Sequence, residues 1–303
     1  MPIFILMAIG YLIKKAKLTD KKGFDVMNKV NFKLFLPVLL FNNIYSTKTA
    51  DFFDIRLVIF TVAAVIVIFI LGYIAVLFLT KDNKKRGVML QGFFRANYAI
   101  LGIPLVSYIC GDKTTGLASL MVAVVIPVFN VLAVVALERF REGNNRLDIA
   151  KLLRGIITNP LIIGSILGVI VFLSGIKFPA LIEKSIKDVA SVSTPLAIIV
   201  LGAVFEFSDI KGSFRENLIT VVARLIVVPL MVIPAAVLFG FTGEALACLL
   251  VIFGAPVAVS SLAMSQQMEG DETLAAQTIT TSTAFCLITL FLWIFVLSYL
   301  GLF

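Results

Sequence analysis

Two pairs of helix-breaking residues interrupt long apolar stretches, one pair in each half of the chain. The first is Gly102 with Pro104 in RANYAILGIPLVSY, and the second is Gly254 with Pro256 in IFGAPVAVSSLAM. Proline removes a backbone donor and glycine tolerates non-helical angles, and a helix broken at membrane depth survives only where it is buried in protein or lines a wet cavity. The amides freed at half-helix N-termini carry partial positive charge and suit an anionic group. The pattern predicts a binding site for a small anion at two broken helices, with two simple proline kinks as the alternative.

Polar side chains cluster near both breaks. Asn97 precedes Pro104 by seven residues and offers an amide donor and acceptor, while Ser260 and Ser261 follow Pro256 by about one turn. Serines in membrane helices also commonly bond a carbonyl of their own helix, which is the alternative for each of them. The predicted substrate-binding residues are Asn97, Gly102, Ile103, Pro104, Gly254, Ala255, Pro256, Ser260 and Ser261.

Two arginines lie within apolar stretches. Arg95 precedes Asn97 by two residues, and Arg224 sits in VVARLIVVPL. A charge inside the membrane costs at least a few kcal/mol, so each is a candidate for attracting an anion into the pathway. Snorkelling to the interface or bonding to carbonyls is the alternative for each.

The residue types needed for other chemistry are missing or dispersed. The sequence has no histidine and no carboxylate in the middle of an apolar stretch, and its three cysteines are isolated. A nucleophile with a nearby base, or a cluster of metal ligands, is therefore not expected. We predict no catalytic residue, no metal site and no cofactor, and hence that the chain is not an enzyme.

Composition sets the environment of these residues. The chain of 303 residues is 60% hydrophobic and 15% charged, whereas soluble domains have about 25% charged residues. The net charge of +8 comes from short basic clusters between apolar stretches, which argues against a nucleic-acid partner. An all-α polytopic membrane protein in contact with the lipid bilayer is expected.

Apolar stretches separated by polar or glycine-rich breaks predict ten transmembrane helices. The predicted spans are 1–13, 26–45, 55–80, 87–110, 115–139, 150–174, 181–205, 214–239, 245–267 and 274–302. If the loop after the first span is inside, the basic clusters at 14–22, 81–86 and 139–154 all lie inside. The positive-inside rule then predicts a cell-membrane protein with both termini outside.

Three pairs of residues recur in the same order in the two halves: Gly10 and Gly168, Pro37 and Pro195, and Pro104 and Pro256. The first two pairs are 158 residues apart and the third is 152 apart. The recurrence predicts two five-helix repeats, residues 1–140 and 141–303, although three chance coincidences are the alternative. Because five crossings are an odd number, the second repeat would be inverted, as in many secondary transporters.

Short motifs in the same order along the whole chain resemble those of the auxin efflux carrier family, which includes the plant PIN carriers and bacterial permeases. They include IGYLIKK, LPVLLF, NYAILGIPL, TNPLIIGSILG, PLAIIVLGAVF and APVAVSSLAMSQQMEGDE. The resemblance implies a fold similar to the bile acid sodium symporters, with a scaffold of helices 1, 2, 6 and 7. It also implies a transport domain of helices 3–5 and 8–10, in which broken helices 4 and 9 cross at Pro104 and Pro256.

The resemblance also bears on the site and the partners. Asn97 matches the family's substrate-site asparagine, whereas Ser260 stands where many bacterial members have a second asparagine. Plant members add a long cytosolic loop between the halves, which is a short basic stretch here. A homodimer through the scaffold is implied, and bacterial relatives are commonly described as malate or malonate permeases.

The leading hypothesis is a secondary or potential-driven carrier that moves a small organic anion by alternating access. Its substrate would be a malate-like dicarboxylate or an auxin-like carboxylate. An inside-negative potential of 100 mV drives an anion outward by about 2.3 kcal/mol per charge, so export needs no coupled ion. A sodium- or proton-coupled importer of the same fold is the alternative, followed by a channel or sensor.

Overall fold

The computed structural model describes residues 2–46, 54–110, 115–141, 149–204 and 210–303. These parts of the chain are almost entirely helical, and the only bridge of β type in them is a single antiparallel one between Ala96 and Val257. The helices are α1 (Pro2–Lys15), α2 (Lys21–Val30), η1 (Asn31–Phe35), α3 (Leu36–Tyr45), α4 (Ile55–Leu79), α5 (Asn83–Phe94), α6 (Tyr98–Cys110), α7 (Thr115–Arg139), α8 (Ile149–Thr158), α9 (Pro160–Ser174), α10 (Ala180–Val204), α11 (Ile210–Val222), η3 (Ala223–Val227), α12 (Val228–Leu238), α13 (Gly243–Gly254), α14 (Ser260–Gln267) and α15 (Glu272–Tyr299).

Among the described residues, every predicted span consists mainly of helix. Within the described residues, five helical segments are each long and apolar enough to cross a bilayer: Ile55–Leu79, Leu117–Arg139, Ala180–Val204, Ser213–Leu238 and Glu272–Tyr299. The remaining spans are shorter helices. The second runs through α2, η1 and α3 without a break, whereas the fourth is divided into α5 and α6, the sixth into α8 and α9, and the ninth into α13 and α14.

Side-chain caps explain where several helices begin. The carboxylate of Asp82 accepts from the amide of Lys84 at 2.8 Å and so starts α5. In the same way, Asp271 accepts from the amide of Leu274 at 2.8 Å and starts α15. Such caps satisfy amides that have no acceptor within the helix. The helices α5 and α15 therefore begin at defined residues.

Glycines let two pairs of helices approach closely. A Cβ on Gly10 of α1 would lie 1.9 Å from the carbonyl oxygen of Ile199 in α10, and one on Gly168 of α9 would lie 3.1 Å from that of Phe41 in α3. Small residues at such contacts bring helix backbones together where lipid provides no hydrophobic driving force. The pairs α1–α10 and α3–α9 are therefore held by backbone contact.

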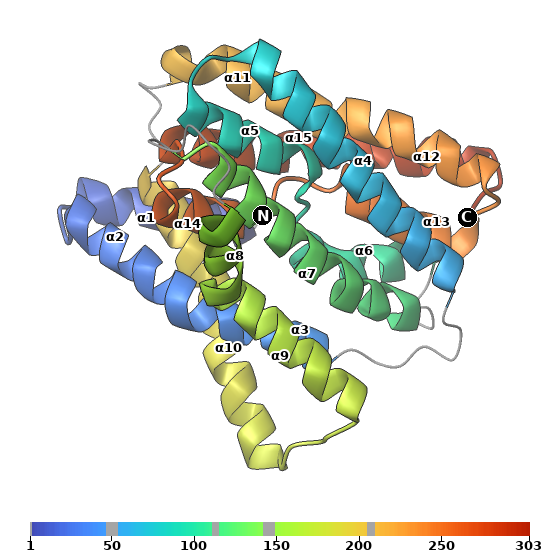
Figure 1. The fold of residues 1–303 in the computed structure, drawn as a ribbon, viewed down its shortest axis with the longest axis horizontal. Coiled ribbons are helices and arrows are strands. Elements are labelled where there is room, and N and C mark those ends of the chain that lie inside the picture. The colour runs from blue at the N-terminus through green and yellow to red at the C-terminus, as the bar shows by residue number, and fades with distance from the viewer. Residues whose placement is uncertain (1, 47–53, 111–114, 142–148, 205–209) are drawn as a thin grey trace.

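The helices form two groups in space. Figure 1 shows α1, α2, α3, α9 and α10 on one side and α4, α11, α12, α13 and α15 on the other. The helices α5 and α6 lie with the second group, and α7 lies between the two groups (Figure 1). Two of the divided helices, α5–α6 and α13–α14, meet in the second group. There α13 contacts α6, and α14 contacts α5.

Candidate functional site

Two helix breaks lie against each other in the interior. The first separates α5 from α6 at residues 95–97, and the second separates α13 from α14 at residues 255–259. The amide of Asn97 donates to the carbonyl of Pro256 at 2.9 Å, and the amide of Ala258 donates to the carbonyl of Arg95 at 3.2 Å. The two extended segments thus satisfy each other's backbone groups, as buried backbone requires. We call this pair of segments the crossing.

The position predicted for the first break is wrong, and the position predicted for the second is confirmed. Gly102 lies inside α6, and the backbone of Ile103 and Pro104 continues the same helix, although their side chains lie outside the described residues. A proline within a helix costs one backbone bond and bends it without always ending it. The absent Cβ of Gly102 makes room for the ring of Tyr98, because a Cβ there would lie 2.9 Å from it. Pairing with the second segment, which sequence spacing does not reveal, fixes the first break nearer to α5.

Arg224 holds the C-terminal ends of both interrupted helices. Its Nε donates to the carbonyl of Ala255 at 2.8 Å and its Nη2 to that of Ile252 at 2.7 Å, at the end of α13. Its Nη1 donates to the carbonyls of Phe93 and Phe94, both at 3.2 Å, at the end of α5. The last carbonyls of a helix receive no hydrogen bond from an amide of the same helix. They also lie at the negative end of the helix dipole. Arg224, which is fully buried, satisfies both ends at once, so bonding to carbonyls is the observed arrangement.

Arg95 lies within the crossing and bonds to neutral groups. Its Nη2 donates to Oδ1 of Asn130 in α7 at 2.9 Å, and its Nη1 approaches the sulfur of Met264 in α14 at 2.7 Å. The amide of Asn130 then donates to the hydroxyl of Ser165 in α9 at 3.1 Å. This chain of bonds connects the crossing to α9.

The crossing carries positive charge that no carboxylate of the described residues compensates. Among the described residues, neither Arg95 nor Arg224 makes an ion pair, although both side chains are buried. The helices α6 and α14 begin beside the crossing, so the positive ends of their helix dipoles lie there. Interactions between charges are strong in such a water-poor interior. The electrostatics of the crossing favour an anion.

Polar groups at the crossing are available to a ligand. The side chain of Asn97 is buried and makes no hydrogen bond to another described residue. The hydroxyl of Ser261 is buried and has no partner in the described parts of the chain, whereas Ser260 is half-buried at the start of α14. Buried polar groups normally have partners. Asn97 and Ser261 are therefore the side chains best placed to receive one.

The predicted site residues divide between the crossing and its surroundings. The two paired segments contain Arg95, Asn97, Ala255 and Pro256. The crossing is bordered by Gly254, Ser260, Ser261 and Arg224. Gly102, Ile103 and Pro104 lie further along α6.

Sequence reasoning missed two polar contributors. Asn130 is a polar amide in an otherwise apolar stretch, three residues after Pro127. Its isolation among apolar residues is a sequence feature that could have indicated a role at the site. Gln91 donates to Oγ of Ser265 at 2.7 Å and so connects α5 to α14. Both residues brace the crossing from helices that flank it.

Comparison with known proteins identifies the kind of protein that carries this crossing. The family described as Membrane transport protein matches residues 1–294. The chain belongs to this family. An uncharacterized transporter of Methanocaldococcus jannaschii is 26% identical over 300 residues, covering 96% of this chain and 95% of the relative. The uncharacterized transporter YfdV of Escherichia coli K12 is 20% identical over 307 residues, covering 98% of this chain and 96% of the relative.

Membership of the Membrane transport protein family fixes the general activity. The chain is a membrane transporter, and its relatives across nearly their whole length are also described as transporters. A transporter of this kind needs a site that binds its substrate within the membrane. The crossing has the burial, the charge and the unpaired polar groups that such a site requires.

Proposed function

We propose that this transporter is a secondary carrier of a small organic anion, either a malate-like dicarboxylate or an auxin-like carboxylate. The observation that carries the proposal is the pair of buried arginines, Arg95 and Arg224, that have no carboxylate partner among the described residues. An anion entering the crossing supplies the missing negative charge. A cation would meet repulsion from both guanidinium groups.

The contacts proposed for the carboxylate follow from the free groups at the crossing. The side-chain amide of Asn97 donates to one oxygen, and the hydroxyl of Ser260 or Ser261, at the positive end of α14, donates to the other. Anion binding at helix N-termini needs no further charged ligand. Arg224 acts as a positioning residue because its donors are taken by carbonyls, and Arg95 supplies positive potential. Gly102, Ile103 and Pro104 shape α6 beyond the direct contacts.

The proposed architecture is ten transmembrane helices in two inverted repeats of five. It is supported by a matched pair of contacts: Gly10 meets Ile199, and Gly168 meets Phe41. Gly10 and Gly168 are 158 residues apart, and so are Phe41 and Ile199. A contact that recurs between corresponding positions of both halves is the expectation for a repeated fold. The proposed halves are residues 1–140 and 141–303.

Transport by alternating access would require two groups of helices to move against each other. We assign the scaffold to spans 1, 2, 6 and 7, which include α1, α3, α9 and α10, and the transport domain to spans 3–5 and 8–10. The grouping in Figure 1 supports this division. Both termini outside the cell, a homodimer through the scaffold and location in the cell membrane complete the proposal.

The proposal is tested by ligand-dependent thermal stability of the purified protein, measured against a set of small mono- and dicarboxylates. An anion that stabilises the wild type should lose its effect in Asn97→Ala and keep it in Asn83→Ala, which removes an amide from the exposed beginning of α5. Binding at 100 times Kd stabilises a protein by about 2.7 kcal/mol, which is a readily measured shift. An equal shift in the wild type and in Asn97→Ala would refute the assignment of the site.

Coupling to sodium or protons is the second candidate mechanism. The unpaired oxygen atoms of Gln91 and Ser261 are the kind of ligand that sodium accepts. Flux of the stabilising anion into proteoliposomes should be measured with and without a sodium or proton gradient. Uptake that disappears without the gradient would favour the coupled importer, whereas ohmic single-channel currents would favour a channel.

A further inference from the structure

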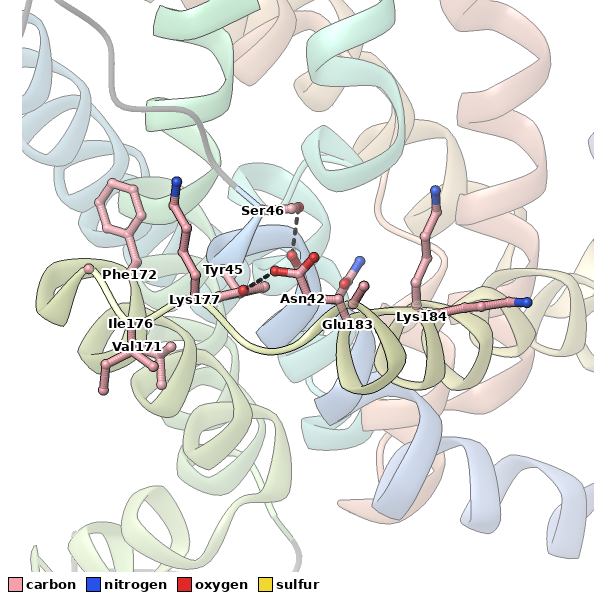
Figure 2. Close-up of a pocket in the computed structure, with 12 residues that line it drawn as sticks. Asn42, Tyr45, Ser46, Val171, Phe172, Ile176, Lys177, Glu183 and Lys184 are labelled. Carbon is pink, nitrogen blue, oxygen red and sulfur yellow. Dashed lines mark hydrogen bonds between the residues drawn. The ribbon is translucent and has the colours of Figure 1, made fainter.

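A second polar cavity lies away from the crossing. It has a volume of about 810 Å³ and is formed by the C-terminal ends of α3 and α9, the turn after α9 and the first turns of α10. None of its lining residues comes from α5, α6, α13 or α14. The cavity, shown in Figure 2, is therefore separate from the proposed substrate site. We call it the scaffold pocket.

Tyr45 gives the scaffold pocket a fixed wall. Its hydroxyl donates to the carboxylate of Glu183, drawn as a dashed line in Figure 2, and accepts from the amide of Phe178 at 3.1 Å. Its ring packs against Phe178 with centroids 5.3 Å apart and stacks on Phe41 at 5.8 Å. Gly175 ends α9 in the left-handed region with φ of 67°, which favours glycine. Glu183, the only carboxylate among the described residues that line the pocket, is thus already engaged in its wall.

Three lysines give the pocket a net positive charge. Lys177 lies in the turn, and Lys184 and Lys187 lie one helical turn apart on α10. None of the three makes an ion pair with another described residue. Figure 2 shows Lys177 and Lys184 extending from the backbone toward the same side. The negative charge of Glu183 offsets only one of the three positive charges. A ligand of negative charge therefore suits the pocket.

The surroundings of the lysines are apolar and exposed. Val171 and Ile176 line the pocket itself. Leu173 and Leu181, on the flanking helices, have exposed fractions of 75% and 78%. At the end of a membrane-spanning helix, apolar side chains next to lysines match a ligand that is anionic at one end and apolar at the other.

We propose that the scaffold pocket binds an anionic amphiphile, with its phosphate or carboxylate among Lys177, Lys184 and Lys187 and its apolar part along Val171 and Ile176. The hydroxyl–carboxylate pair of Tyr45 and Glu183 fixes the spacing between α3 and α10 that the lysines need. Two sources supply this chemistry: an anionic phospholipid of the membrane and a free amphiphilic carboxylate. The proposal does not rest on the substrate assigned to the crossing.

The test measures the thermal stability of the delipidated full chain in detergent. The probes are phosphatidylglycerol, the zwitterionic phosphatidylcholine, and octanoate as a free amphiphilic carboxylate. The variant Lys177→Gln/Lys184→Gln/Lys187→Gln is compared with a control of equal charge change, Lys22→Gln/Lys29→Gln/Lys81→Gln, whose lysines are exposed and remote from the pocket. Each lysine near an anionic lipid contributes roughly fivefold in affinity, so the triple variant should bind on the order of 100-fold more weakly.

Each outcome decides a part of the proposal. Stabilisation by phosphatidylglycerol that the pocket variant loses and the control keeps identifies a phospholipid, and the same pattern with octanoate alone identifies a free carboxylate. Glu183→Gln keeps a hydrogen-bonding partner for Tyr45 while it removes the negative charge, so it should bind the anionic probe several-fold more tightly. Equal binding by wild type, pocket variant and Glu183→Gln would overturn the proposal even if Asn97→Ala behaves as expected at the crossing.

Discussion

Replacing Arg224 tests the structural basis of the crossing most directly. In Arg224→Met the side chain keeps much of its apolar volume, but four carbonyls at the ends of α5 and α13 lose their donor. The expected result is a destabilised protein whose two helix breaks no longer hold their relative position. Transport should be lost with it, because the substrate groups of Asn97 and α14 lie on the segments that Arg224 secures.

The size of the effect follows from the number of bonds. Hydrogen bonds between membrane helices average about 0.6 kcal/mol, and bonds to a charged group in soluble proteins contribute about 1.5–3 kcal/mol. Removing the buried cation recovers part of its desolvation cost. For four carbonyls we expect a net loss of about 3 kcal/mol, which corresponds to a melting temperature lower by about 6–10 °C. Arg224→Lys keeps the charge but lacks the planar array of donors, so it should fall between Met and the wild type.

The chain provides its own reporter for this measurement. Cys248 and Cys286 are buried, and Cys248 lies on α13, one of the helices that Arg224 holds. A thiol-reactive fluorogenic dye therefore follows unfolding in detergent without an added probe. Arg215→Met is the matched control, because this exposed arginine of α11 is lost with the same change in charge. A melting temperature of Arg224→Met equal to that of Arg215→Met would refute the role assigned to Arg224.

Three further predictions concern helix packing, the domain interface and an ion pair between loops. Gly10→Ala should lower the melting temperature by several degrees because its Cβ would lie 1.9 Å from a backbone oxygen, whereas Gly155→Ala, with no atom within 4 Å of the added Cβ, should not. Glu272→Gln removes the ion pair with Lys21 at 2.7 Å and weakens its 2.7 Å bond with Gln266. If α2 separates from the start of α15 during transport, Thr273→Cys should then react faster with a membrane-impermeant maleimide, in a background without the native cysteines. An unchanged rate of labelling would argue that the contact between Lys21 and Glu272 does not hold the two helices together. The hydrogen bond and charge of Arg141 lower the pKa of Glu269 below its ordinary value of 4.5, so the stability that Glu269 adds relative to Glu269→Gln is present above pH 4.5 and is lost as the pH falls below it. Arg141→Gln should abolish this difference between the two proteins in thermal melts at pH 7 and pH 3.5.

The contacts around Gln266 show how a polar residue near a helix end can be misjudged. The place of this glutamine in the polar run SQQMEGDE at the end of the ninth predicted span, taken alone, favours a side chain that faces water. In the structure it is half-buried, accepts from the amide of Asn28 and donates to Glu272 at 2.7 Å. The difference arises because α2, more than 200 residues away in sequence, packs against α14. Periodicity within one helix carries no information about such a neighbour.

The sequence by itself determined the solvent and the helical segments of this protein. Continuous apolar stretches with few charges satisfy their backbone only as helices when lipid surrounds them, so the helix positions follow from composition and length. The recurrence of Gly10 at Gly168 predicted a repeated unit, whereas the structure adds that a Cβ at either position would meet a backbone oxygen. The second break, at Ala255 and Pro256, was likewise evident from its local residues.

Only the tertiary structure decided where the first break lies and what the buried arginines do. The break falls at Arg95–Asn97 rather than at Gly102–Pro104 because the segment pairs with residues 256 and 258 of the other half of the chain. For the same reason, Arg224 becomes a bond donor to two helix ends that are far apart in sequence. A buried backbone group can leave a helix only where another hydrogen-bond partner is available. Here that partner is determined by how the two halves of the chain pack together.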